Sequence, residues 1–127
     1  MQLSVSMLSL LFVLSFTSLL AQEALPNPVF TTYEHDFGDL KEGERREFIF
    51  GFVNEGTIPF IISKIHVQCG CTAPEWSDKP VLPHEKGQIK IVYNSSGKEG
   101  IQRKIVSVKS NYHELIKLKI IANVLTD

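Results

Sequence analysis

Turn-forming residues punctuate this chain at intervals of about 8–12 positions, which is the spacing of short strands in a sandwich or barrel. The intervening runs are rich in β-branched and aromatic residues, and apolar side chains alternate with polar ones along them. No stretch shows the apolar period of about 3.6 residues that marks an amphipathic helix. The chain is therefore limited to an all-β fold.

The clearest strand covers residues 45–53, where Phe48, Phe50 and Phe52 alternate and are expected to face the core. Similar patterns predict further strands at residues 29–33, 58–69, 86–93, 101–109 and 114–124. Residues 71–83 contain three prolines and are interpreted as a loop in which Trp76 folds back as a lid. Roughly seven strands in about 100 residues predict an immunoglobulin-like antiparallel β-sandwich.

The first 21 residues contain no Asp, Glu, Lys or Arg and carry an apolar run that ends at Ala21. This pattern is typical of a secretory signal peptide, so we expect cleavage after Ala21 and a periplasmic or secreted protein. The alternative is an uncleaved membrane anchor, which six Ser and Thr side chains in this stretch disfavour. Residues 22–28 would then be a short linker and residues 29–127 the sandwich domain.

Charge and motifs exclude several classes of function. Lys and Arg number 13 against 14 Asp and Glu, which gives a net charge of −1 and no basic excess for nucleic acid. The chain has no nucleophile elbow, phosphate-binding loop or zinc-protease helix. We therefore expect no catalytic residues, no cofactor, no nucleic acid and no membrane insertion after signal cleavage.

Cys69 and Cys71 are the only cysteines, and they leave four interpretations open. In an extended strand, residues two apart are too distant to bridge, but a bend at Gly70 could bring the sulfurs together as a disulfide or redox pair. Two thiolates could also hold Cu(I) or half of a zinc site, with His84 as the best placed additional ligand. The thiols could pair with a partner protein. Finally, they could pack as small core residues, with or without a bridge, which is the favoured interpretation.

The register of residues 61–71 bears on that choice. Ile65 and Val67 share the parity of both cysteines, so an unbroken strand would point the thiols toward the interior. His66 has the opposite parity and would point away from them.

The chain resembles the bacterial family called domain of unknown function 1573, which is similar to the Hydin and major-sperm-protein branch of immunoglobulin-like folds. The resemblance covers residues 33–124 and rests on several short motifs. These are Asp36-Phe37-Gly38, the Phe48 to Phe52 alternation, Cys69-Gly70-Cys71-Thr72, Trp76, Pro80, Pro83 and Ser110-Asn111. His84 stands where the family usually has Gly, and His tolerates positive φ better than most residues. The resemblance implies an exported sandwich with no established activity.

Together these observations predict a non-enzymatic binding or scaffolding module of the bacterial envelope, with an unidentified protein partner. It would act through a sheet face, a loop end or an exposed strand edge. The alternative is thiol–disulfide redox chemistry or Cu(I)/Zn handling at Cys69 and Cys71.

Overall fold

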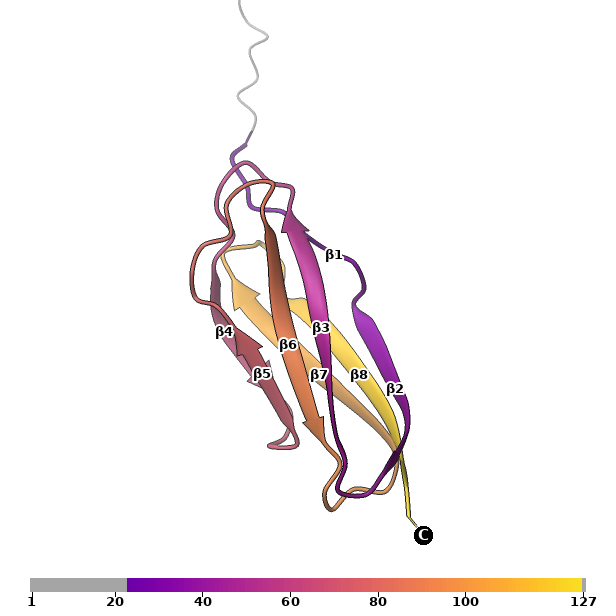
Figure 1. Ribbon diagram of the computed structural model, residues 1–127. Coiled ribbons are helices and arrows are strands. Elements are labelled where there is room, and N and C mark those ends of the chain that lie inside the picture. Colours follow the sequence, from indigo (N-terminus) through magenta and orange to yellow (C-terminus); the bar gives the residue numbers. More distant parts are fainter. Residues whose placement is uncertain (1–22, 127) are drawn as a thin grey trace, which may run out of the picture.

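A computed structural model of the protein describes residues 23–126, which form eight strands and no helix. The strands make two four-stranded sheets that pack face to face (Figure 1). The predicted signal peptide, residues 1–21, lies outside the described residues. Among residues 23–126 no helix has the length and apolarity to span a membrane.

The first sheet has the order β1–β3–β6–β5, and the second has the order β2–β8–β7–β4. In chain order the strands are β1 Pro28–Phe30, β2 Glu34–Lys41, β3 Arg45–Asn54, β4 Ile62–Val67, β5 Thr72–Trp76, β6 Lys86–Asn94, β7 Gly100–Ser110 and β8 Ile116–Leu125.

The predicted immunoglobulin-like sandwich is confirmed, with two corrections. It has eight strands rather than about seven, and β2 pairs with β8 in parallel, so the second sheet is not wholly antiparallel. A parallel pair needs a long crossover connection. That condition is met because nearly the whole domain separates β2 from β8 in the sequence.

The core lies between the sheets and follows the predicted alternation. Phe50 and Phe52 of β3 are buried, and Phe48 packs against the same cluster. From β6 and β8 the inward residues are Ile89, Ile91, Tyr93, Ile116, Leu118 and Ile120, all buried as their parity predicts. Burying each such side chain contributes about 1.5–3 kcal/mol, so this cluster is the main source of stability.

The predicted run at residues 58–69 is not one continuous strand. Its central strand, β4, is only six residues long, and its pairing with β7 shifts register between Ile62 and Lys64. The bulge inverts the side-chain parity, so Ile62 is buried and Ile61 is exposed, opposite to the predicted register. Ile65 and Val67 still face inward, but the strand ends before Cys69.

The predicted loop at residues 71–83 contains a strand, β5, which pairs with β6 from Thr72↔Tyr93 to Trp76↔Ile89. Pro74 is tolerated because β5 is an edge strand. Asn94 N–H donates to Cys71 C=O, so odd-numbered β5 residues bond to β6 and the nitrogen of Pro74 faces outward. The expectation of a buried Trp76 lid is also wrong, because Trp76 at the end of β5 is 37% exposed.

A buried side chain, Asn54, ties together the loops at one end of the sandwich. Its Oδ1 accepts from the N–H groups of Asn27 and Gly56 at 3.1 and 2.9 Å. Its Nδ2 donates to Ile58 C=O and Val81 C=O, both at 2.9 Å. Residues 25–27, predicted as a linker, are therefore fastened to the domain. Gly56 is required there, because a Cβ would collide with their backbone.

We predict that Asn54→Ala lowers the free energy of unfolding by roughly 3–5 kcal/mol, because it removes four hydrogen bonds and leaves the N–H groups of Asn27 and Gly56 and the C=O of Ile58 without a partner. Urea denaturation measures the change. The matched control is Asn111→Ala, since exposed Asn111 makes two similar bonds to Ile61 N–H and Pro59 C=O. It should cost about 1 kcal/mol. Equal effects at the two positions would contradict the assignment of Asn54 as the organising residue.

On the β2 side, a stacked pair joins the two sheets. The imidazole of His35 in β2 lies 3.7 Å, centroid to centroid, from the Phe48 ring of β3, with 7° between the ring planes. Burial lowers the pKa of His35, and the neighbouring Asp36 carboxylate opposes this shift only in part. The folded state therefore favours the neutral imidazole.

A lowered folded pKa means that the unfolded chain binds the proton more readily. The contribution of His35 to stability is thus complete above about pH 6.5 and is lost as the pH falls through the folded pKa. We predict a smaller loss of stability between pH 7.5 and pH 5 in His35→Phe, which keeps an aromatic stack without a titrating group. Parallel pH dependence of the two proteins in urea denaturation would refute this role.

Candidate binding site

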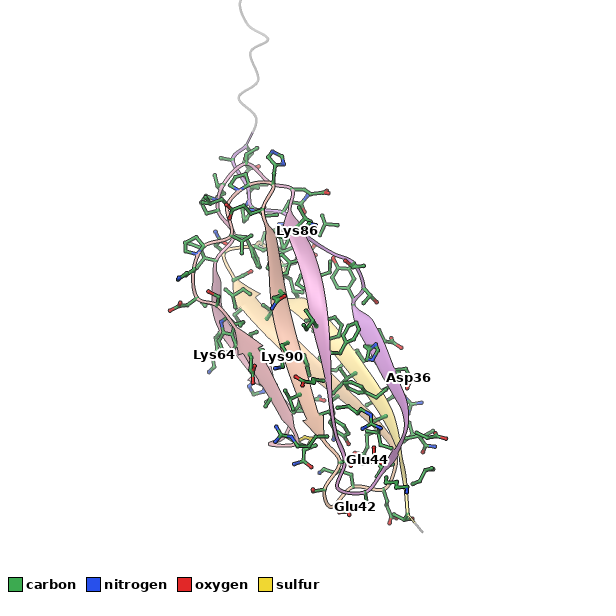
Figure 2. All side chains as sticks on the ribbon, in the orientation of Figure 1. Asp36, Glu42, Glu44, Lys64, Lys86 and Lys90 are labelled. Carbon is green, nitrogen blue, oxygen red and sulfur yellow. A yellow bond between two sulfur atoms is a disulfide. The ribbon has the colours of Figure 1, made fainter. Side chains whose placement is uncertain are left out.

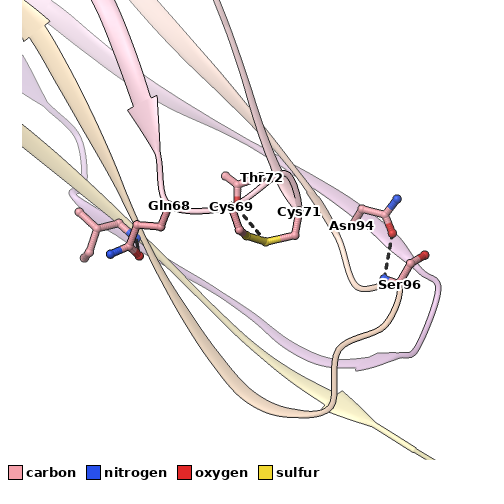
Figure 3. The surroundings of a disulfide bond; sticks show 7 residues. Gln68, Cys69, Cys71, Thr72, Asn94 and Ser96 are labelled. Atoms are coloured by element: carbon pink, nitrogen blue, oxygen red, sulfur yellow. Dashed lines mark hydrogen bonds between the residues drawn. A yellow bond between two sulfur atoms is a disulfide. The ribbon is translucent and has the colours of Figure 1, made fainter.

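The two cysteines lie in a turn between β4 and β5, where the chain crosses from one sheet to the other (Figure 3). The structure joins Cys69 and Cys71 by a disulfide, with their Cα atoms 5.3 Å apart. Thr72 N–H donates to Cys69 C=O at 3.3 Å and closes the turn. Both cysteines are partly buried, and Cys71 packs against the core. The unbroken register had predicted that the sulfurs lie on the inner face of a strand. They lie on a turn instead.

Both neighbouring sheets hold this turn in place. The Gln68 side chain accepts from Ile105 N–H of β7 at 2.9 Å, and Asn94 N–H of β6 donates to Cys71 C=O at 2.8 Å. Behind the turn, Tyr93 is fully buried and its hydroxyl has no hydrogen-bond partner in the described chain. Burial raises the pKa of Tyr93, so this phenol stays protonated. Hydrogen bonds from both sheets therefore hold the turn in place. Tyr93 stays protonated and cannot accept a proton from the cysteines.

His84, the third candidate metal ligand, lies at the opposite end of the molecule. It sits in the turn Leu82–Glu85, closed by Glu85 N–H to Leu82 C=O at 3.0 Å, and its φ of 69° is positive. A glycine-like turn therefore survives with His in place. The nine residues of β6 separate this turn from the disulfide, which is roughly 30 Å at the rise of a strand. The structure does not bring His84 and the cysteines together, and bridged sulfurs are not thiolate ligands.

A cleft of about 630 Å³ lies at the far end of β5 from the disulfide. Buried Phe52 and Phe60 form its floor, with their ring centroids 5.3 Å apart. Trp76 lines one wall, and it also borders a second, shallower hollow between β4 and β5. An exposed indole therefore stands at the mouth of a cleft that has an aromatic floor and a polar rim.

The course of the chain explains why this cleft is open. After Trp76 the chain leaves the first sheet, and Val81 exchanges two backbone hydrogen bonds of 2.8 and 2.9 Å with Phe60, which lies just before β4. It returns to the first sheet at Lys86, where β6 begins. The start of β6 therefore has no strand beside it on the β5 side. Gly87 adds to the opening, since a Cβ there would collide with the Phe52 ring.

Charged side chains surround the cleft, and some of them are already paired. Lys90 Nζ lies 2.7 Å from Glu47 and 3.4 Å from Glu75, and the hydrogen bond to Glu47, followed by the attraction of both carboxylates, raises the pKa of Lys90. Glu85 accepts from Leu82 N–H at 3.2 Å. Lys86 lies on the same strand as Lys90, nearer the loop end of the molecule (Figure 2).

Trp76 was predicted as a buried lid, which is wrong, and the other residues of the cleft were not predicted as site residues. Phe60 was part of a predicted strand, and Lys86 and Gln88 were ordinary positions of another. Only a break in the sheet makes them neighbours of Trp76. The proline-rich segment after Trp76 was a usable signal, because such a segment cannot continue a paired strand.

A known protein family matches nearly all of the described residues. The family described as "Protein of unknown function (DUF1573)" matches residues 29–124. The chain belongs to the DUF1573 family. No curated protein matches it.

Solved structures share the fold of this DUF1573 protein at low identity. A Porphyromonas gingivalis protein of unknown function is 17% identical, with a TM-score of 0.67 over 84% of this chain and 51% of that one. The PapD-like domain 7 of human CEP192 is 10% identical, with a TM-score of 0.65 over 88% and 94%. The VesB protease of Vibrio cholerae is 7% identical, with a TM-score of 0.64 over 76% and 31%. The chain thus spans about half of the first protein and under a third of VesB.

Proposed function

We propose that this protein is a non-enzymatic binding module of the bacterial envelope and that it holds a partner protein in the cleft beside Trp76. The observation that supports the proposal most is the partly exposed indole at the mouth of a cleft with the Phe52 and Phe60 rings at its floor. Large aromatic side chains beside fully desolvated pockets dominate protein–protein binding energy. The polar and charged rim would supply orientation and specificity.

The strand edges support the cleft as the binding site, because each edge carries a feature that hinders pairing with another strand. In the first sheet, β1 has three residues and begins with Pro28, and β5 has Pro74 at its centre. In the second sheet, register shifts interrupt β2 between Asp36 and Asp39 and β4 beside Lys64. Recruitment along a complete edge strand is thus disfavoured.

Export is part of this proposal. The uncharged apolar segment at residues 1–21 is typical of a signal peptide, and the Cys69–Cys71 disulfide suits an oxidising compartment. A periplasmic or secreted protein would meet its partner there after cleavage, and the DUF1573 fold would serve as a rigid support for the cleft.

A photo-cross-linking residue at Lys79, on the cleft rim, tests the proposal in the bacterium that encodes the chain. We expect an adduct that Trp76→Ala reduces at least tenfold, because truncating a central aromatic anchor costs about 2 kcal/mol or more. The same cross-linker at Lys117, on the other sheet, is the control. An adduct insensitive to Trp76→Ala, or adducts from Lys117 alone, would contradict binding at the cleft.

The disulfide favours a second candidate, thiol–disulfide exchange with a partner dithiol. One partner thiolate would attack a sulfur, break the Cys69–Cys71 bond and form a mixed disulfide, which the second partner thiol would then resolve. Cys69 and Cys71 would end as two thiols and the partner as a disulfide, with two electrons and two protons transferred. The exposed position of Gly70 gives such a partner access.

The double variant Cys69→Ser/Cys71→Ser separates the two candidates. The bridge closes a very short loop, so its loss should cost only about 1.5 kcal/mol. If the protein is a binding module, we predict that the variant keeps its Lys79 adduct, because the five residues of β5 separate the turn from the cleft. Loss of the adduct in a variant that remains folded by circular dichroism would favour the redox candidate.

A further inference from the structure

The start of β6 has backbone groups that point into the cleft. Hydrogen bonding alternates along an antiparallel strand, so successive residues bond to opposite neighbours. The bond from Asn94 N–H to Cys71 C=O shows that even-numbered β6 residues face β5, and the bond from Asn54 N–H to Glu85 C=O shows that odd-numbered residues face β3. Lys86 and Gln88 therefore direct their N–H and C=O groups away from β3.

No strand lies opposite these groups. The pairing of β5 with β6 ends at Trp76↔Ile89, and the chain then turns away to the bridge between Val81 and Phe60. Outside the strand ladders, no backbone hydrogen bond within residues 23–126 involves Lys86 or Gln88. An extended segment that continued the line of β5 would find the N–H groups of Lys86 and Gln88 there as donors.

Apolar space lies directly beside these backbone groups. The inward position between them is Gly87, which has no side chain, and the Phe52 ring lies against it. Phe60 and Trp76 complete an apolar surface. Because side chains of a strand alternate between faces, one apolar side chain of an added segment would enter this space, and its neighbours would face the rim.

The rim has an excess of positive charge available to a ligand. Glu75 is paired with Lys90, and Glu85 accepts a backbone hydrogen bond. Lys79 and Lys86 also line the cleft and form no ion pair with any carboxylate of residues 23–126. Acidic residues on either side of the apolar one would meet these ammonium groups.

We propose that the cleft binds an extended peptide segment of a partner protein, which pairs with Lys86 and Gln88 of β6 in line with β5. The segment carries an apolar residue for the Phe52–Phe60 floor and acidic neighbours for Lys79 and Lys86. This mode of recognition, in which the main chain gives affinity and alternate pockets give specificity, rests on the proposed function and adds its ligand class.

A random heptapeptide display library selected on the wild-type protein tests the proposal. We expect enrichment of sequences in which an apolar residue is flanked by acidic ones. The fluorescence of Trp76, the only tryptophan, then reports the affinity of selected peptides directly. No enrichment, or enrichment without acidic residues, would overturn the proposed ligand class.

The matched variants are Gln88→Pro and Gln88→Ala. Proline removes the N–H that points into the cleft, at a position where no partner strand uses it, whereas alanine keeps that N–H. We expect Gln88→Pro to lose roughly tenfold or more in affinity and Gln88→Ala to stay within about threefold of wild type. Equal affinities would overturn strand pairing.

A second measurement does not depend on how Gln88→Pro folds. Methylation of single backbone nitrogens in a selected peptide should abolish binding at alternate positions only, and a uniform effect would overturn the proposal. Lys86→Glu should weaken acidic peptides at least tenfold, whereas Lys117→Glu on the opposite sheet should not.

The remaining outcomes separate this proposal from the proposed function. A Trp76-dependent adduct from Lys79 without any enriched peptide would leave the binding module standing and overturn the peptide mode. Loss of both would overturn both. Self-association that Gln88→Pro abolishes, seen by sedimentation, would assign the cleft to a second copy and overturn a partner peptide.

Discussion

The buried amide of Asn54 is the interaction on which the shape of this protein depends. Its side chain makes four hydrogen bonds to backbone groups from three segments, and its own backbone pairs with His84 and Glu85. Through Val81, which also pairs with Phe60 ahead of β4, it holds the chain after β5 has ended. The cleft exists because that segment cannot lie beside β6. A polar residue in the interior thus determines where the surface is open, and the satisfied bonds offset its burial.

The two ends of β5 have different characters. At one end the Cys69–Cys71 turn carries the chain from one sheet to the other and is bonded to both. At the other end Trp76 marks the place where the chain leaves the first sheet again. The short edge strand between them is closed to pairing by Pro74 but lies in line with unpaired backbone of β6. The first end stabilises the crossover, and the second borders the cleft that we propose as the binding site.

Much of the fold followed from side-chain alternation, because burial on one face leaves a direct record in the sequence. The inward residues Phe50, Ile91 and Leu118 were predicted on that basis and are all buried. The prediction failed where the chain breaks the period. One bulge beside Lys64 inverted the register of Ile61 and Ile62, and Pro74 made an edge strand look like part of a loop. The cleft was beyond sequence reasoning, because its groups meet only through long-range contacts at Phe60 and Val81.

The central claim is that Lys86 and Gln88 have unpaired backbone amides although they belong to an interior strand. Amide hydrogen exchange of the free protein, measured residue by residue, tests this directly. The account predicts fast exchange at Lys86 and Gln88 and slow exchange at Lys90 and Val92, which point the same way but face β5. Protection of Gln88 equal to that of Lys90 would contradict the account, because its N–H would then have a partner and the cleft would have no open strand edge to offer.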